Sequence, residues 1–487
     1  MKSNDNKKGP SIVSGAIWSV LDNTASQIIT FVIFIILAKL VTPGIYGMLS
    51  VSLLVTQFFR IFIFDSIATS IIRKKDPTSV DYNCSFLLCF LLSLPAFLIV
   101  FVAAPYVESY MNVPELSNVI RATGIIILVS GLTRTHEAWL MHNLMFRSLA
   151  IRSIISISIG GIVGVYLAYH GHAVASLVVQ QVVTSFISLV VLWITTPWKP
   201  RLNFSKTSIK ESLAYSKHVA LSNITFFVNQ SSDVFFVTYF LGSTAAGIYS
   251  AGKRIVNTLS LVLTSALTRV SLPAFSRYKN DINEFGKKYL QATYFTALVT
   301  APAFIGLATL SHDVTYLLLG DKWMSSVPIM QIVSAVGFIT AIGNYNQSVI
   351  FARDKPEWQA RLALFTAVSN VIAFYFFVRF GVVATALIFS VRTVLLYPVS
   401  VWCALTLLNL KFKNYIVELI VPVLCSLLMC LLIVIIQQHF ILSSTWLGMI
   451  VKIVVGAVFY TLLILLFSSS KKKTMIFGLV RKIANAN

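Results

Sequence analysis

Apolar segments of spanning length follow one another through almost the whole sequence, and this repetition leaves the chain very few folds. A helix that crosses a bilayer needs roughly 20 mostly apolar residues. By this criterion we place about fourteen such segments, at residues 14–38, 44–66, 82–104, 116–136, 149–168, 173–195, 214–239, 247–271, 288–310, 328–350, 360–379, 382–407, 416–437 and 447–467. Because lipid offers no hydrogen bonds to an open backbone, we expect an all-α polytopic membrane protein.

The composition supports this expectation and argues against a nucleic-acid partner. The chain is 57% hydrophobic and only 11% charged, whereas soluble domains are about 45–50% apolar and about 25% charged. The formal net charge of +21 would suit phosphate binding. The charges, however, are spread through short connections and form no basic domain, so we predict membrane lipids, and no nucleic acid, as partners.

Lysine and arginine alternate between connections as the positive-inside rule expects. If the N-terminus is cytoplasmic, the inside connections hold Lys2, Lys7, Lys8, Arg73, Lys74, Lys75, Arg147, Arg152, Lys199, Arg201, Lys206, Lys210, Lys217, Arg277, Lys279, Lys287, Lys288, Arg353, Lys355, Arg361, Lys411, Lys413, Lys471, Lys472, Lys473, Arg481 and Lys482. The other side offers little beyond Lys39, Lys322 and Arg379. We therefore predict that both termini are cytoplasmic and that the first apolar segment is a spanning helix, not a cleaved signal peptide.

A weak internal repeat indicates two halves. The stretch LVTPGIYGMLS at 40–50 matches FLGSTAAGIYSAG at 240–252, and aligning the two Gly-Ile-Tyr triplets also superposes Gln27 on Gln230. Parallel repeats are a common transporter plan, although a turn between helices favours glycine in any case. We expect an N-lobe at 1–196, a C-lobe at 197–410, an extra helix pair at 411–468 and a basic cytoplasmic tail at 469–487.

Charged residues inside the apolar segments are the candidate functional groups, because a charge in lipid is costly and usually faces a cavity or a partner. We assign Arg60, Lys253, Arg254 and Arg121 as cations of a substrate cavity. Asp22 and Asp233 are charge partners for them or protonatable ion-coupling groups. Asp65, Arg269 and Glu418 lie near segment ends, where long or paired side chains reach the interface.

Amides are also frequent in these segments. Asn23, Gln27, Asn229, Gln230 and Asn257 either bond sugar hydroxyls across a cavity or bond neighbouring helices. The five cysteines lie in apolar segments without a C-x-x-C pair, and no histidine has metal-ligand spacing. A phosphate-binding G-x-x-x-x-G-K-[ST] loop is missing as well. We therefore expect no catalytic residue, no metal and no cofactor, and a protein that is not an enzyme.

Several stretches resemble one family. Asp233 followed by FLGSTAAGIYSAGKRIVNTLS, then SLPAFSRYKND at 271–281 and LLLGDKWMSSVPIMQIVSAVG at 317–337, is similar to Wzx-type polysaccharide flippases, and the nearest branch looks like the colanic acid exporters. The stretches SGAIWSVLDNTASQ and LAKLVTPGIYGMLS fit the same pattern. These proteins belong to the multidrug/oligosaccharidyl-lipid/polysaccharide exporter superfamily.

The resemblance implies about fourteen helices in two six-helix lobes around a central cationic cavity, with a helix pair outside. It also implies an undecaprenyl-diphosphate-linked oligosaccharide as cargo, moved from the cytoplasmic to the periplasmic leaflet of the bacterial inner membrane. Arg254 and Asp233 match positions where the family carries arginine and aspartate, whereas FVNQSSDVFF lacks basic residues that the family often has there. The sugar handled therefore stays open.

Three alternatives stay open beside a flippase. An ion-coupled multidrug exporter of the same superfamily would favour an acidic cavity for cationic drugs, which the surplus of arginine and lysine disfavours. A membrane-embedded glycan polymerase or ligase usually carries a large outer loop, and all loops here are short. A scaffold among other glycan-assembly membrane proteins is compatible with transport.

Overall fold

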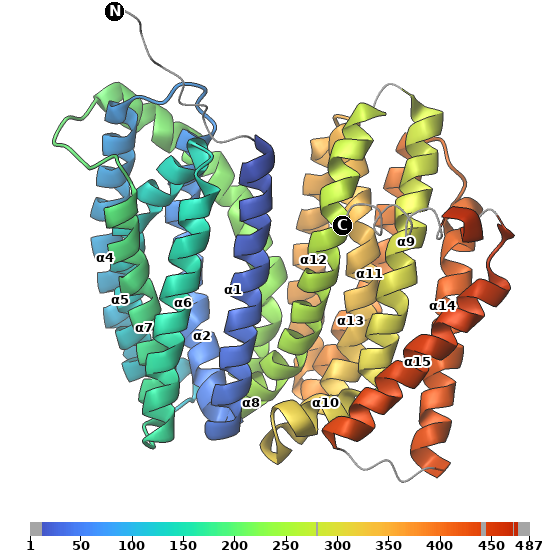
Figure 1. Ribbon diagram of the computed structural model, residues 1–487. Helices are drawn as coiled ribbons and strands as arrows, with labels where there is room; N and C mark the ends of the chain where they lie inside the picture. Colours follow the sequence, from blue (N-terminus) through green and yellow to red (C-terminus); the bar gives the residue numbers. More distant parts are fainter. Residues whose placement is uncertain (1–11, 279–280, 440–444, 471, 476–487) are drawn as a thin grey trace, which may run out of the picture. The chain divides into compact units, whose positions relative to one another are not determined.

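A computed structural model describes residues 12–278, 281–439, 445–470 and 472–475, and every regular element in these ranges is a helix (Figure 1). The elements in chain order are α1 (Ile12–Leu40), α2 (Pro43–Phe59), η1 (Arg60–Asp65), α3 (Ser66–Ile72), α4 (Ser79–Met111), α5 (Leu116–His142), α6 (Phe146–Tyr169), α7 (Ala173–Thr195), α8 (Lys206–Arg277), α9 (Ile282–Thr309), α10 (Ser311–Leu318), η2 (Asp321–Ser326), α11 (Val327–Ala352), α12 (Pro356–Phe377), η3 (Val378–Phe380), α13 (Val382–Leu407), α14 (Phe412–His439) and α15 (Trp446–Phe467). The expected all-α polytopic fold is confirmed. The N-terminal lysines, most of the basic tail and the side chain of Arg269 lie outside the described residues.

Thirteen helical segments of the described chain are long and apolar enough to cross a membrane. The difference from the expected fourteen arises in α8, which contains both the seventh and the eighth expected segment. The expected turn at 240–246 is reduced to Gly242, whose backbone alone leaves the helical region (φ 83°, ψ 176°). Glycine has no Cβ and adopts this positive φ without strain, so one residue breaks the helix where we expected a loop.

The chain divides into two compact units, which we describe separately. The first unit contains Met1–Ala251 and Ala363–Thr385, and the second contains Gly252–Leu362 and Ala386–Asn487. Helix α5 is the centre of the first unit, because it packs against α2, α3, α4, α6 and α7. Buried apolar side chains of α2, α4 and α5, such as Val51, Val100 and Ile127, form the core at this centre.

In the second unit α9 has the central place and packs against α11, α14 and α15. Tyr289 of α9 is fully buried and donates a 2.7 Å hydrogen bond to Asn346 of α11. The two last helices, α14 and α15, pack against each other. Lys452 of α15 forms a buried 2.6 Å ion pair with Asp313 of α10. The residues around 311–326, expected as an outer loop, thus form two short helices, α10 and η2.

The two halves of the weak repeat meet within the first unit. A Cβ on Gly47 would overlap the carbonyl of Ser243, and a Cβ on Gly247 would overlap the carbonyl of Pro43. Small residues allow this backbone approach, as in other close helix crossings of membrane proteins. The repeated Gly-Ile-Tyr sequences are therefore neighbours, and glycine is needed at both positions for packing.

Candidate functional site

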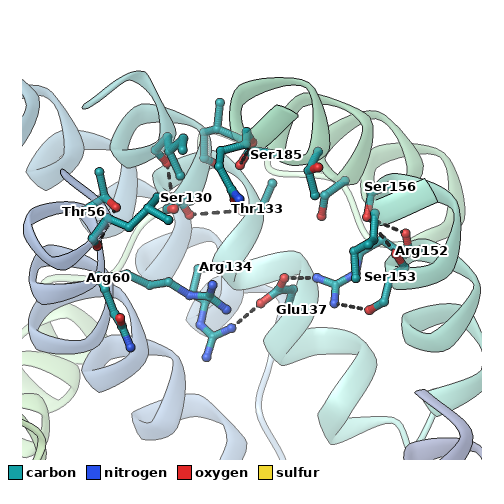
Figure 2. Close-up of a pocket in the computed structure, with 18 of the residues that line it drawn as sticks. Thr56, Arg60, Ser130, Thr133, Arg134, Glu137, Arg152, Ser153, Ser156 and Ser185 are labelled. Carbon is teal, nitrogen blue, oxygen red and sulfur yellow. Dashed lines mark hydrogen bonds and ion pairs between the residues drawn. The ribbon is translucent and has the colours of Figure 1, made fainter. Parts of the chain in front are cut away.

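The first unit encloses a polar cavity of about 600 Å³ between α2 with η1, α5, α6 and α7 (Figure 2). Three arginines, two carboxylates, two glutamine amides and eight hydroxyl groups contribute to its wall. These polar lining residues are Thr56, Gln57, Arg60, Asp65, Ser130, Thr133, Arg134, Glu137, Arg152, Ser153, Ser156, Gln181, Thr184, Ser185 and Ser188. Such a concentration of polar groups between spanning helices marks a hydrated site, because lipid-facing helices cannot support it.

Four of the charged groups form a chain of ion pairs. The Nε of Arg134 lies 2.7 Å from the Oδ1 of Asp65. Glu137, which is buried, pairs with Arg134 through one carboxylate oxygen and with Arg152 through the other. Figure 2 shows Glu137 between the two guanidinium groups. This chain joins η1, α5 and α6 and leaves its four members balanced in formal charge.

Arg60 is the fifth charged group of the cavity and gives it one surplus positive charge. Its side chain is exposed to the cavity, and among the described residues it has neither an ion pair nor a side-chain hydrogen bond. Arg60 begins η1, a six-residue π-helical turn that ends at Asp65. The wider turn releases backbone carbonyls from the α-helical pattern, and such turns are frequent at functional sites.

Helix α8 supports the π-helical turn from outside the cavity. The amide of Asn223 donates to the carbonyl oxygen of Ile61 and to the hydroxyl of Ser66, each over 3.0 Å. The hydroxyl of Ser216 donates to the carbonyl of Ser66 over 3.2 Å. The carbonyl oxygen of Ile61, the residue after Arg60, is thus bonded by a side chain of α8.

The hydroxyl groups of the wall present mainly acceptor oxygens to the cavity. Thr133, Ser156 and Ser185 each donate their hydrogen to the carbonyl four residues earlier in their own helix, over 2.8–3.0 Å. A hydroxyl that donates to the backbone keeps its lone pairs available. The cavity therefore combines cationic donors with oxygen acceptors, a set suited to a ligand that has both an anion and hydroxyl groups.

We expected four cations in a substrate cavity. Arg60 lines the polar cavity, and the other three lie elsewhere. Arg121 lies against α4, with its guanidinium 4.8 Å from the ring centre of Phe101 and its Nε donating to the carbonyl of Phe101. Lys253 and Arg254 belong to the second unit, where both are half-buried. The ammonium of Lys253 lies 5.2 Å from the ring centre of Phe389.

The expected acids and amides lie outside this cavity, all but Asn257 in the first unit. Asp22 accepts a 3.2 Å hydrogen bond from Ser26 of its own helix. Asp233 is buried and accepts a 2.9 Å hydrogen bond from the hydroxyl of Tyr249. Asn229 donates to the carbonyl of Ala363 and accepts from the amide of Asn370, both in α12. Of the two roles expected for the amides, it therefore has the one of bonding a neighbouring helix. Of the other amides, Gln27 is half-buried and Asn23, Gln230 and Asn257 are exposed, Asn257 in the second unit.

Arg134 and Glu137 were not recognised from the sequence as site residues, and Arg152 was expected in a connection. We expected spans at 116–136 and 149–168, but α5 continues to His142 and α6 already begins at Phe146. The missed signal is the spacing of Arg134 and Glu137, since residues three apart on a helix are neighbours and opposite charges pair there. Such a pair neutralises itself and permits the helix to continue.

No group of three or more histidine, cysteine, aspartate or glutamate side chains with metal-site geometry occurs among the residues that the structure describes. The five cysteines are free thiols. The chemistry of the cavity is thus that of ionic and hydrogen-bonding groups.

Two relatives and one solved structure place the chain among known proteins. The teichuronic acid biosynthesis protein TuaB of Bacillus subtilis is 24% identical over 430 residues, which are 86% of this chain and 87% of TuaB. The lipopolysaccharide biosynthesis protein WzxC of Escherichia coli is 22% identical over 355 residues, 72% of each chain. The lipid II flippase MurJ in an inward closed conformation has the same fold, with a TM-score of 0.76, 14% identity, and coverage of 93% of this chain and 98% of MurJ.

The sequence profile of the family described as "Polysaccharide biosynthesis protein" matches residues 36–328. This match covers more than half of the chain and includes the helices that line the cavity. The similarity to Wzx-type proteins that the motifs indicated is confirmed at this level. The chain belongs to the polysaccharide biosynthesis protein family of multi-span membrane proteins.

Proposed function

We propose that this protein is a flippase that moves undecaprenyl-diphosphate-linked oligosaccharide repeat units from the cytoplasmic to the periplasmic leaflet of a bacterial inner membrane. The product would serve the synthesis of a surface polysaccharide such as colanic acid, O-antigen or capsule. Family membership, the relatives TuaB and WzxC, and the fold shared with MurJ support a transport role in glycan assembly. The observation that carries the proposal is the guanidinium of Arg60, which has no ion-pair partner in the described part of the chain and faces a hydroxyl-lined cavity.

The cavity suits the head group of such a lipid. A guanidinium binds phosphate oxygens through parallel N–H donors, and such charge-assisted bonds are the stronger kind. The acceptor oxygens of Thr133, Ser156 and Ser185 would receive hydrogen bonds from sugar hydroxyls. The apolar lipid tail has no place among these groups and would remain in the bilayer.

The ion-pair chain would respond to the cargo. A diphosphate near Arg60 competes with Glu137 for Arg134 and Arg152, because all three guanidinium groups line one cavity. When the diphosphate replaces the Glu137 carboxylate, each arginine still has an anionic partner, so the net gain in binding free energy is small. The cargo can therefore be released on the far side of the membrane. We propose that two lobes, 1–196 and 197–410, move in alternating access and so open the cavity of the first lobe to one side of the membrane and then to the other, with both termini in the cytoplasm.

The charge of the cavity separates this proposal from its alternatives. A multidrug exporter for cationic compounds needs a surplus of carboxylates, whereas three arginines face two carboxylates here. A glycan polymerase or ligase needs an extramembrane site for its chemistry, and in the described residues the connections between spanning helices are short. A transporter that is not an enzyme accounts for both features.

Deletion in the native host is the test of the function. Cells that lack the protein should accumulate a lipid-linked oligosaccharide that stays inaccessible from the periplasm, and they should lose the surface polysaccharide. Wild-type protein should restore export, and Arg60→Ala at matched protein levels should not. Arg379→Ala is the matched control, since Arg379 lies in the same unit on the rings of Phe240 and Tyr375, outside the cavity. Unchanged surface polysaccharide in the deletion strain would contradict the proposal.

A further inference from the structure

A second cavity of the first unit, of about 460 Å³, lies where three connections meet. It is lined by residues 75–78 of the connection between α3 and α4, by the start of α4, by the end of α5, and by Trp198 of the connection between α7 and α8. Tyr82, Trp139 and Trp198 line it, and we call it the aromatic pocket. Its volume lies within the range of roughly 300–1,000 Å³ that small-molecule sites have.

The aromatic pocket is separate from the cavity of Arg60. Helix α5 lies between them: Glu137 lines the cavity, and Trp139 lines the pocket. Residues two apart on an α-helix point about 200° away from each other, so these side chains leave opposite faces of α5. A ligand in the pocket is therefore not the group held by Arg60.

The aromatic side chains are turned into the protein. Tyr82 is 4% exposed, and its ring centre lies 5.7 Å from that of Trp198. Tryptophan and tyrosine at a membrane interface usually place their rings at the lipid head groups, and these two instead pack on each other. The hydroxyl of Tyr82 and the Nε1 of Trp198 are buried and have no hydrogen-bond partner among the described residues. Buried polar groups of this kind call for a partner.

The rim of the pocket carries unengaged polar groups with balanced charge. Lys75, Asp76, Ser79 and His142 have no side-chain hydrogen bond or ion pair within the described part of the chain. Lys75 and Asp76 offset each other. A nucleotide or an anionic lipid head group would need more cations than carboxylates at the rim. An uncharged ligand with many hydroxyl groups can instead form hydrogen bonds with the carboxylate of Asp76, the hydroxyl of Ser79 and the ammonium of Lys75.

We infer that the aromatic pocket binds carbohydrate. A pyranose ring has an apolar C–H face that packs on an aromatic ring, and hydroxyls around its edge that donate to carboxylates. Trp139 and Trp198 provide the rings, and Asp76 provides the carboxylate. The sugar comes either from a soluble saccharide or from the glycan of a lipid-linked oligosaccharide, and both present the same chemistry.

Calorimetric titration of the full-length protein in lipid nanodiscs tests the inference. The probes are glucose, galactose, N-acetylglucosamine, glucuronate and lactose. We expect saturable binding of at least one sugar, with a Kd on the order of 1 mM. Asp76→Asn and Trp139→Ala should each raise that Kd at least about tenfold, and Arg379→Ala should leave it unchanged. Asp76 is exposed in a connection, so its variant reports binding even if Trp139→Ala fails to fold.

Each outcome decides the inference. Absence of saturable binding for all five sugars would overturn it, as would wild-type affinity in Asp76→Asn together with a folded Trp139→Ala. Where binding is found, competition by lipid-linked oligosaccharide extracted from the native host assigns the site to the lipid-linked glycan, and lack of competition assigns it to a soluble saccharide. The titrations with the five free sugars contain no diphosphate and measure no translocation, so their failure leaves the proposed flippase function standing.

Discussion

The hydroxyl of Tyr249 donates a hydrogen bond of 2.9 Å to the Oδ2 of Asp233, and both side chains are buried. In the other half of the repeat, the hydroxyl of Tyr46 reaches the carbonyl of Phe34 over 3.4 Å. Each tyrosine of a Gly-Ile-Tyr sequence thus bonds the segment before it. This relationship gives Asp233 a structural partner.

Asp233→Asn should therefore preserve export, because the amide oxygen still accepts from Tyr249. Asp233→Ala should lower the free energy of unfolding by about 1–3 kcal/mol, since it leaves a buried hydroxyl without its acceptor. Thermal unfolding in detergent and surface polysaccharide in complemented cells measure the two effects. Loss of export in a stably folded Asp233→Asn protein would instead identify Asp233 as an ion-coupling carboxylate.

Gly247→Ala should destabilise the first unit. The added Cβ would overlap the carbonyl of Pro43, so the two backbones must separate. Gly124→Ala is the control within the same unit, because the atoms nearest to its Cβ would be side-chain atoms of Phe97 and Val100 at an ordinary contact distance of 3.5–3.6 Å. Alanine also favours a helix over glycine by about 1 kcal/mol. We expect a lower melting temperature for Gly247→Ala and an equal or higher one for Gly124→Ala; equal behaviour of the two variants would refute the close approach.

Glu137→Gln should be among the most damaging single changes in the cavity. It leaves the half-buried Arg152 without its carboxylate partner, and breaking a buried pair costs about 3–5 kcal/mol. The double variant Glu137→Gln/Arg152→Gln should regain part of the loss, because the uncompensated charge is gone. Denaturation midpoints of the four proteins form the cycle. Additive effects of the two substitutions would show that the residues do not interact.

In the second unit, Lys452→Met should lower the unfolding temperature, because it removes an ion pair between α15 and α10. The substitution removes the ammonium that lies 2.6 Å from the carboxylate of Asp313, a residue that is only 4% exposed. Lys452→Met/Asp313→Asn should unfold at a higher temperature than Lys452→Met, since a neutral amide tolerates burial better than a carboxylate that has lost the ammonium beside it. A double variant no more stable than the single one would argue against the ion pair.

The sequence predicted the helical fold because the length and spacing of apolar segments determine it directly. It also indicated Arg60, a single charge well inside an apolar segment. The expectation that a charge inside an apolar segment faces a cavity also selected Lys253, whose ammonium lies near the ring of Phe389 in the second unit. A charge can be stabilised by a ring as well as by a cavity, and the sequence does not show which way a helix is rotated.

The ion-pair chain could not be predicted by hydropathy for a related reason. The expected segments at 116–136 and 149–168 contain Arg134 and Arg152 but exclude Glu137, the carboxylate that pairs with both, because α5 continues beyond 136 to His142. Arg152 and Glu137 neutralise each other only after α5 and α6 have packed. The helical break at Gly242 escaped prediction as well, because a single positive φ replaces a loop without any change of composition.

The central claim is that Arg60 holds the anionic part of a lipid-linked glycan during its passage across the membrane. The direct measurement is the rate at which purified protein in liposomes moves lipid-linked oligosaccharide between leaflets, compared for wild type, Arg60→Lys, Arg60→Ala and Arg379→Ala. We predict that Arg60→Ala lowers the rate at least about tenfold, as expected when about 1.4 kcal/mol or more of binding is lost. Arg60→Lys should retain an intermediate rate, and Arg379→Ala should match wild type. A wild-type rate for folded Arg60→Ala would contradict the account.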